Sequence, residues 1–325
     1  MLETSEKIFV AGHLGMVGSA IVKNLESKGF NNLITADKIS LDLTDQKQVN
    51  DFFRSENIDQ LYIAAAKVGG IYANSVYPGQ FIYQNLMIQS NLINAAYKSN
   101  LKKLLFLGSS CIYPINSPQP IHESQLLAGP LEETNQAYAV AKISGIELCK
   151  SYNNEYGTDF RCVMPTNIYG SNDNFHHESS HVIPALISKF YNAKIHDMHE
   201  VKVWGSGKPL REFLHVEALA EACIFIMSQS KDKFLNLLPC SSPHINIGSE
   251  SEISINDLAR ILASISGFNG NIIFDSSKPD GAPRKLLDCS AIRSLGWQPK
   301  ISLEEGLTNT YKWFEENQKH VRNTQ

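Results

Sequence analysis

The chain has 325 residues, 43% of them hydrophobic and 19% charged, and 29 basic against 33 acidic side chains give a formal net charge of −4. This length allows a full core and predicts two lobes. A mildly acidic protein has no general attraction for nucleic acid or for an anionic membrane, so neither is expected as a partner. No apolar run approaches the roughly 18 residues that span a bilayer, and the first residues lack a secretory signal pattern, so we expect a cytoplasmic protein.

The cysteines and histidines give no sign of a metal or disulfide framework. The six cysteines are scattered without CxxC spacing, which argues against both a zinc site and a set of disulfides. We expect buried thiols at Cys149, Cys162, Cys223, Cys240 and Cys289, and discuss Cys111 below. The neighbouring His176 and His177 have no Cys or carboxylate partner at ligand spacing, so we expect loop residues there and no metal.

The chain opens with a short apolar run at residues 7–11, then a glycine-rich turn and an amphipathic stretch to about residue 28. This pattern predicts a buried strand, a turn and a helix. Glycines let the backbone approach a pyrophosphate, and the N–H groups at the helix start bind the anion. The spacing is GxxGxxG, and the alternative is a glycine turn without a ligand. The predicted cofactor contacts here are Gly12, His13, Leu14, Gly15, Met16, Val17 and Gly18.

A second predicted strand, residues 32–36, ends at Asp37 and Lys38. An acidic residue at this place accepts hydrogen bonds from the ribose 2′-hydroxyl of NAD. Lys38 could instead face the 2′-phosphate of NADP, and a solvated strand end is a third interpretation. The dipeptide therefore gives conflicting signals about the cofactor.

Strands and helices then alternate, with strands expected at residues 60–65, 103–107 and 160–164 and helices at 85–98 and 138–156. This alternation predicts an α/β fold with a doubly wound parallel sheet. We expect a dinucleotide-binding domain at residues 1–170, to which 213–248 returns. Residues 171–212 and 249–325 are expected to form a second, smaller α/β lobe that binds the substrate.

The helix at 138–156 begins with Tyr138-Ala139-Val140-Ala141-Lys142. At 3.6 residues per turn, Tyr138 and Lys142 lie on one face of the helix. A nearby ammonium favours the phenolate and lowers the pKa of a tyrosine, which suits proton donation to a carbonyl oxygen. The alternative is an amphipathic helix with a snorkelling lysine. Ser109, Ser110 and Cys111 follow the strand at 103–107, at the sheet edge where ligands of such folds bind.

Eight motifs together carry a family resemblance: GHLGMVGSAI, AAAKVGGI, LGSSCIYP, YAVAK, PTNIYG, NDNFHHESSHVIPAL, WGSGKPLREFLHV and KPDGAPRKLLD. The chain resembles the GDP-L-fucose synthases, which are extended short-chain dehydrogenases/reductases (SDRs), from about residue 7 to about residue 317. The glycine turn and the Tyr-x-x-x-Lys spacing mark only the superfamily. The LGSSCIYP motif, residues 172–184 and the KPDGAPRK motif are specific to the family.

The resemblance implies a role for each candidate catalytic residue. Tyr138 donates a proton to the C4 oxygen of a keto sugar, Lys142 lowers the pKa of Tyr138 and holds the nicotinamide ribose, and Ser109 adds a hydrogen bond. Cys111 and His181 form the acid/base pair of an epimerase, since a thiol and an imidazole can both exchange protons near pH 7. From the residues alone, Cys111 would be an inert buried thiol and His181 a hydrogen-bonded loop histidine.

The resemblance also implies the binding residues. Lys189, Arg211 and Lys285 lie near the substrate diphosphate, and bidentate recognition makes Arg211 the strongest of these. Surface solvation is the alternative for the two lysines. Trp204 and Asp280 are implied as further substrate contacts. The implied cofactor contacts beyond the first turn are Leu107, Gly108, Ser109, Ser110, Lys142, Pro165, Thr166, Asn167, Ile168 and His181.

The implied activity is epimerisation at C3 and C5 of GDP-4-keto-6-deoxy-D-mannose and NADPH-dependent reduction at C4, giving GDP-L-fucose. The family often has an arginine where this chain has Leu14, which together with Asp37 leaves NADH as an alternative cofactor. One alternative function is C4 reduction, with or without epimerisation, of a related GDP-4-keto-6-deoxy sugar such as a heptose. A nucleotide-binding regulator on the same fold is a more distant one. The resemblance further implies a homodimer.

Overall fold

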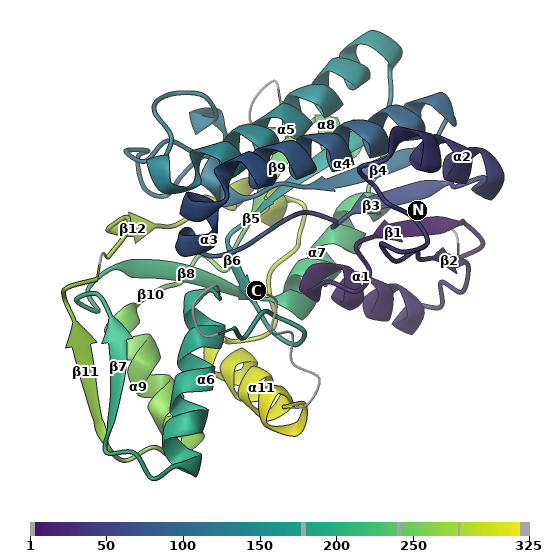
Figure 1. Cartoon of the computed structure of the whole chain (residues 1–325). Coiled ribbons are helices and arrows are strands. Elements are labelled where there is room, and N and C mark those ends of the chain that lie inside the picture. The colour runs from purple at the N-terminus through teal and green to yellow at the C-terminus, as the bar shows by residue number, and fades with distance from the viewer. Residues whose placement is uncertain (1–3, 177–179, 239–241, 279, 319–325) are drawn as a thin grey trace.

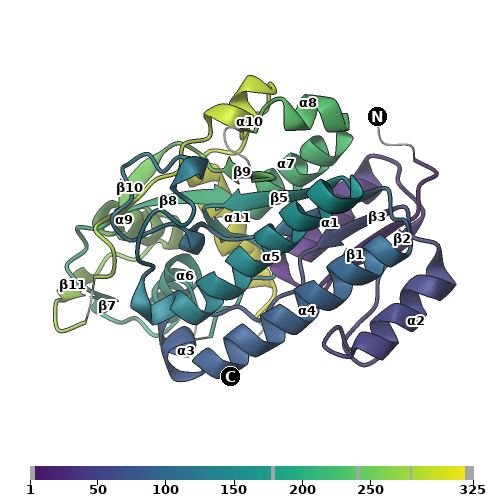
Figure 2. The same ribbon diagram turned by 90° about the horizontal axis from the view of Figure 1, so that it is seen from above.

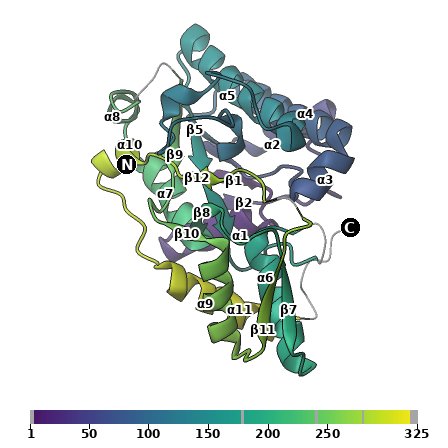
Figure 3. The same cartoon turned by 90° about the vertical axis from the view of Figure 1, so that its left-hand side faces the viewer.

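The structure is a computed structural model that describes residues 4–176, 180–238, 242–278 and 280–318. Figure 1 shows a larger domain built on one sheet, and a smaller lobe below it that carries α6, α9 and α11. Figure 3 shows the same lobe after a quarter turn, with β7 and β11 at the end furthest from the large sheet. The described residues thus form a larger domain and a smaller lobe.

The larger domain has a six-stranded sheet, within the described residues, in the order β2-β1-β3-β4-β5-β9. Every neighbouring pair in it is parallel. Its strands are β1 (Ile8–Ala11), β2 (Leu33–Ile34), β3 (Gln60–Ile63), β4 (Lys103–Leu107), β5 (Phe160–Pro165) and β9 (His244–Ile247). Most of these strands are buried along their whole length, because helices cover both faces of a parallel sheet.

The helices that cover this sheet are α1 (Met16–Ser27), α2 (Gln46–Glu56), α4 (Pro78–Lys98), α5 (Gln136–Tyr156) and α7 (Val216–Ser228). Helices α2, α4 and α5 lie on one face, and α1 and α7 pack together on the other (Figure 1). Figure 2 shows α4 and α5 side by side along the outside of the domain. The predicted doubly wound α/β fold is therefore confirmed.

The smaller lobe contains α6 (Val182–Ile195), α9 (Ile255–Ser266) and α11 (Leu303–Glu316), with β7 (Glu200–Trp204) pairing β11 (Asn271–Asp275). Its core is separate from the core of the large domain and includes Ile187, Leu258 and Phe314, one from each helix. Sequence analysis did not predict α6 or β7. Short elements elsewhere are α3 (Ile71–Val76), α8 (Lys231–Leu235), α10 (Ser290–Ser294) and the 3-10 turns Ser110–Ile112, Glu123–Gln125 and Glu133–Asn135.

Strand β8 (Leu210–His215) joins the two lobes. Its first half pairs with β10 (Glu252–Ser254) and β12 (Arg284–Lys285), and its second half pairs with β6 (Asn167–Tyr169), which follows β5. Strand β8 thus links the segment that follows β5 of the large sheet to the smaller lobe. The expected assignment of 249–325 to that lobe has one exception, since side chains between Leu287 and Trp297 pack in the core of the large domain.

Within the described residues, no helix is both long and apolar enough to cross a bilayer. The same part of the chain contains no cluster of three or more His, Cys, Asp or Glu side chains that could hold a metal ion. Its cysteines are buried and free, namely Cys111, Cys149, Cys162, Cys223 and Cys289. Cys240 and His177 lie outside the described residues.

Candidate active site

The glycine turn after β1 is shaped by two close approaches. Gly12 has φ +87°, and a Cβ there would lie 2.6 Å from the backbone nitrogen of Ala65. A Cβ on Gly18 would lie 2.1 Å from the carbonyl oxygen of Gly12. Glycine is therefore required at both positions, one for its backbone conformation and one for the packing of α1 against the turn. The amide of Gly15 donates to the carbonyl of Gly12 at 2.9 Å and closes the turn.

The start of α1 is left available for an anion. Its N-cap, Gly15, supplies no side-chain hydrogen bond, so the first amides of the helix are not capped by a side chain. Nδ1 of His13 is buried in the same turn without a hydrogen-bond partner. Helix-start amides and the positive end of the helix dipole bind phosphate groups. The turn therefore fits the pyrophosphate of a dinucleotide.

The carboxylate of Asp37 is used within its own turn. Its Oδ1 accepts hydrogen bonds from the amides of Ile39 at 3.1 Å and Ser40 at 2.8 Å, and from the Ser40 hydroxyl at 2.8 Å. The bonds from Ser40 are the main reason that the pKa of Asp37 is lowered. Lys38 is exposed beside it. The geometry thus gives Asp37 a role in shaping the loop, which the sequence did not reveal.

The end of β4 places Ser109 and Cys111 on the rim of the sheet. Ser109 caps the 3-10 turn that follows, and its hydroxyl accepts from the amide of Cys111 at 3.4 Å. Gly108, whose amide bonds to Val163 of β5, lies so close to that strand that a Cβ would meet Met164 at 2.2 Å. Leu107, at the end of β4, presents its carbonyl to Lys142.

Tyr138 and Lys142 lie on the face of α5 that points to this rim. The ammonium of Lys142 donates to the carbonyl of Leu107 at 2.7 Å and lies 5.8 Å from the centre of the Tyr138 ring. The hydroxyl of Tyr138 is hydrogen bonded to Ser109. The Tyr138 ring packs edge to face with Phe81 of α4, with 6.3 Å between ring centres. The structure therefore brings Ser109, Tyr138 and Lys142 together as predicted.

The pKa of Tyr138 does not shift in the expected direction. We expected Lys142 to lower it, but burial is the largest effect and raises it, with a further rise from Cys111 and an opposing effect of the Ser109 hydrogen bond. Burial also lowers the pKa of Lys142 to about 8. The physical reason is desolvation, because protein atoms surround both groups although the Tyr138 ring keeps partial access to solvent.

Cys111 and His181 come from different lobes. Burial raises the pKa of the Cys111 thiol, whereas Lys285, the Ser109 hydrogen bond and Lys142 lower it. His181 stands at the start of α6, where desolvation by the surrounding protein lowers the pKa of its imidazole. At neutral pH these directions favour a neutral thiol and a neutral imidazole. The hydrogen bond to Ser109 places Cys111 in the same group as Ser109 and Tyr138. The pairing of Cys111 with His181 stays a prediction.

The residues after β5 are tied to β8. The amide of Thr166 donates to Ile247 at the end of β9, and its hydroxyl donates to the carbonyl of Glu212 at 3.3 Å. The side-chain amide of Asn167 donates to the same carbonyl at 2.8 Å. These bonds fix the segment from Pro165 to Ile168 at the sheet edge, where cofactor contacts are predicted.

The implied substrate cations form two groups in the second lobe. Arg211 and Lys285 are paired across β8 and β12, and Lys285 also interacts electrostatically with Cys111. Lys189 lies with its ammonium 5.4 Å from the centre of the Trp204 ring, which is 49% exposed. Asp280 uses its carboxylate to accept from the amide and hydroxyl of Ser206, at 2.6 and 2.8 Å. Asp280 therefore shapes the turn after Trp204.

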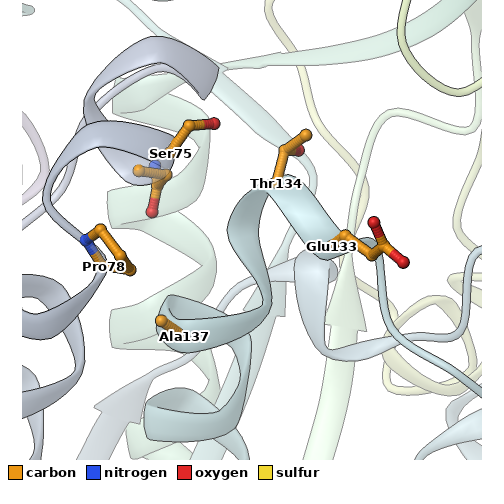
Figure 4. A pocket seen from close by; sticks show the side chains of 6 residues that line it. Ser75, Pro78, Glu133, Thr134 and Ala137 are labelled. Atoms are coloured by element: carbon orange, nitrogen blue, oxygen red, sulfur yellow. The ribbon is translucent and has the colours of Figure 1, made fainter.

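Two pockets adjoin the Tyr138 and Cys111 region. One has a volume of about 240 Å³ and is lined by Asn74, Ser75, Pro78, Glu133, Thr134 and Ala137. Figure 4 shows Ser75 and Thr134 facing each other across it, while the carboxylate of Glu133 points away. The other is lined by Cys111, Lys285 and Glu132, among others. This second pocket connects the thiol of Cys111 to the ammonium of Lys285 in the smaller lobe.

Sequence analysis missed several residues of this region. Glu132 acts electrostatically on both Arg211 and Lys285. Lys278 places its ammonium 5.4 Å from the centre of the Trp204 ring. Glu212 is completely buried beside Arg211. Of these residues, Glu212 could have been found from the sequence, because it is adjacent to Arg211. The contacts of Glu132 and Lys278 join segments that are distant in sequence.

The parallel sheet, the glycine turn after β1 and the Tyr-x-x-x-Lys helix beside the rim of β4 define an extended SDR. Residues 8–248 match the NAD dependent epimerase/dehydratase family. The GDP-L-fucose synthase of Escherichia coli (strain K12) is 53% identical over 319 residues, which cover 98% of this chain and 99% of that protein.

Solved structures agree with this similarity. A GDP-L-fucose synthetase from Naegleria fowleri bound to NADP is 28% identical, with a TM-score of 0.88 over 99% of this chain and 98% of that one. A GDP-6-OMe-4-keto-L-xylo-heptose reductase from C. jejuni is 36% identical, with a TM-score of 0.90 over 97% and 99% of the two chains. The chain belongs to the NAD dependent epimerase/dehydratase family and, within it, to the GDP-L-fucose synthases.

Proposed function

We propose that the protein converts GDP-4-keto-6-deoxy-D-mannose to GDP-L-fucose by epimerisation at C3 and C5 and reduction at C4. The observation that carries this proposal is the convergence of Ser109, Cys111, Tyr138 and Lys142 at one rim of the sheet. The 53% identity to the Escherichia coli enzyme over nearly the whole chain supports the choice of substrate. We also propose that the protein works in the cytoplasm.

A ketone at C4 serves both reactions. Hydrogen bonds to its oxygen stabilise the enolate that forms when a C3 or C5 proton leaves, and a proton delivered to the same oxygen completes reduction. Tyr138 donates that proton, and Ser109, already bonded to the Tyr138 hydroxyl, supplies the second hydrogen bond. Lys142 is held by the Leu107 carbonyl, where it contributes positive charge beside the phenol.

Epimerisation needs an acid and a base on opposite sides of the sugar ring. We assign these roles to Cys111 and His181. Cys111 acts as the base once its thiol has lost its proton, with Lys285 and Lys142 stabilising the thiolate, and His181 exchanges a proton on the other side of the ring. Arg211 and Lys285, with Lys189, hold the diphosphate, and Trp204 offers an exposed ring to the nucleotide.

NADPH is the proposed cofactor, and it supplies the hydride for C4 when bound. The pyrophosphate would be held by Gly12, Gly15 and the start of α1, and Lys38 is available for the 2′-phosphate. The similarity to a structure that binds NADP supports this assignment. Since Leu14 offers no charge and Asp37 is bonded within its own turn, we propose that NADPH is preferred over NADH by a reduced margin.

A second candidate is C4 reduction of a related GDP-4-keto-6-deoxy-heptose. The similarity to a heptose reductase of C. jejuni favours it, although that protein is only 36% identical to this chain. NMR of the products formed from GDP-4-keto-6-deoxy-D-mannose and from the heptose analogue, in separate tubes, tests the choice. GDP-L-fucose from the first tube supports our proposal. Turnover of the heptose alone, or an unepimerised product, would reject it.

We further propose a homodimer formed through the outer faces of α4 and α5. These neighbouring helices leave large apolar side chains on the surface, with Tyr83 62% and Val140 37% exposed. A two-fold axis would make such a patch self-complementary. Light scattering at micromolar concentration that gives the 36.2 kDa mass of one chain would contradict the dimer.

A further inference from the structure

Glu212 is a carboxylate with no access to solvent at the point where the two lobes join. It is the last residue of the half of β8 that pairs with β10 and β12, and the half that pairs with β6 begins at the next residue, Phe213. A buried charge is costly unless hydrogen bonds satisfy its oxygens. The bonds of Glu212 therefore show which segments depend on it.

Each carboxylate oxygen of Glu212 holds a different stretch of backbone. Oε1 accepts from the amide of Glu250 at 2.7 Å, in the loop between β9 and β10. Oε2 accepts from the amide of Leu287 at 3.0 Å, just after β12. Gly248 approaches so closely that a Cβ there would lie 2.2 Å from Oε1. The loop is thus built around this carboxylate.

The position of Lys285 depends on the same bonds. Strand β12 has only two residues, Arg284 and Lys285, and Lys285 is paired with Arg211 on β8. The Leu287 amide, two residues further on, is anchored by Glu212. Successive side chains of a strand point to opposite faces, so Arg211 and Glu212 point in opposite directions. Glu212 therefore holds, from the far side of β8, the segment that presents Lys285 next to Arg211.

We propose that Glu212 is a positioning residue for substrate binding, which fixes Lys285 beside Arg211 so that both cations meet the diphosphate of the GDP sugar. This inference rests on the proposed function, which assigns these two cations to the diphosphate. Glu212 itself touches neither substrate nor cofactor in this scheme. It acts by setting the register and distance of two cations that lie on adjacent strands.

Toward the cofactor side, the carboxylate of Glu212 has a contact with the Thr166 side chain, and the main chain of Glu212 accepts two hydrogen bonds. Its carbonyl accepts from Thr166 and Asn167, and a side-chain substitution leaves these bonds in place. Glu212→Gln keeps the size of the side chain but turns one acceptor into an amide donor that faces a backbone N–H. One of the two anchored segments is then released, and the expected defect is in GDP affinity rather than in NADPH affinity.

The test is calorimetric titration of the full chain with GDP and, separately, with NADPH. Glu212→Gln should weaken GDP binding by about tenfold or more, the effect of one displaced charged contact, and leave NADPH binding within about twofold. The KM for the GDP sugar should rise more than kcat falls. Asp59→Asn is the matched control, because the Asp59 carboxylate also accepts a backbone amide, from Lys7 at 2.9 Å, at the start of β3. This control should bind GDP like the wild type.

The outcomes separate the inference from the proposed function. A wild-type protein that does not bind GDP overturns the proposed function itself. Wild-type GDP affinity in Glu212→Gln, or equal losses for GDP and NADPH, overturns the positioning role alone. If Glu212→Gln does not fold, Glu212→Asp is measured instead, since it keeps the charge but is too short to reach both amides. A selective loss of GDP affinity in that variant supports the inference, and equal losses again overturn it.

Discussion

Tyr138→Phe removes one hydroxyl from the centre of the site and leaves its surroundings in place. Lys142 keeps its bond to Leu107, and the new ring can still pack edge to face with Phe81. The lost hydrogen bond to Ser109 should cost about 1 kcal/mol of stability, the usual net worth of such a bond. The variant should therefore fold, and its defect should be chemical.

The size of that defect follows from the role of the hydroxyl. A positioned general acid contributes about 10² to 10⁴-fold to a rate, or about 3 to 5 kcal/mol of barrier. Hydride transfer, followed by NADPH absorbance in single turnovers, should fall by this factor. Deuterium exchange from solvent at C3 and C5, followed by NMR, should persist in part, because Ser109 and Cys111 still lie at the rim.

Cys111→Ser provides the matched comparison, since it removes the thiol and leaves Tyr138 and Lys142 intact. This variant should stop the deuterium exchange and still oxidise NADPH slowly, giving a product of altered ring stereochemistry. The reasoning is refuted if Tyr138→Phe reduces C4 at the wild-type rate. If Cys111→Ser gives wild-type exchange and product, the thiol is only a packed side chain. If the unmodified enzyme reduces its substrate without exchange, epimerisation belongs to another protein.

Three further predictions each concern a single residue. Asp37→Ala releases the Ser40 turn, so kcat/KM should fall for NADPH and NADH alike; a fall for NADH alone would mean that the carboxylate binds a free ribose 2′-hydroxyl. Burial lowers the pKa of His244 to about 4, so stability should be lost as pH falls from about 6.5 toward 4, where only the unfolded chain gains the proton. Urea titrations of His244→Gln should show that loss reduced by about 3 kcal/mol, and an unchanged pH profile would contradict it. Tyr83→Asp should give monomers by light scattering, and an unchanged mass would exclude this face as the dimer interface.

The parts of the fold that could be predicted from sequence are those with strong local patterns. Strand β4 has the predicted bounds, and α5 begins two residues before the predicted start. Both elements combine an apolar run with an abrupt change of sequence pattern at their ends. Helix α6 was missed because it follows a polar loop without an N-cap side chain that would signal its start. Strand β8 was missed because it reads as a loop motif, WGSGKPLREFLHV, and its partners β6, β10 and β12 are short and distant in sequence.

The site, like the fold, has features that follow from residues close in sequence and features that depend on distant segments. Tyr138 and Lys142 are one helical turn apart, so their proximity follows from periodicity alone. The pKa of Tyr138 could not be predicted in this way, because it depends on burial by segments that are remote in the chain. The sequence left open whether Asp37 contacts the ribose, and the structure shows that its carboxylate closes the turn to Ser40. Sequence therefore predicted that Ser109, Tyr138 and Lys142 meet, and the structure was needed to show how each one is used.

The two reactions depend on one alignment between the lobes. Ser109 is bonded to Tyr138 and to Cys111, so in the proposed mechanism one carbonyl oxygen bound at Ser109 serves both chemistries. The two cations proposed for the diphosphate, Arg211 and Lys285, are paired across β8 and β12, and Lys285 interacts with Cys111 from that side. A change at Tyr138 or Cys111 should therefore separate reduction from epimerisation. A change that shifts β8 or β12 should impair both reactions together, because it moves the sugar relative to the one oxygen that they share.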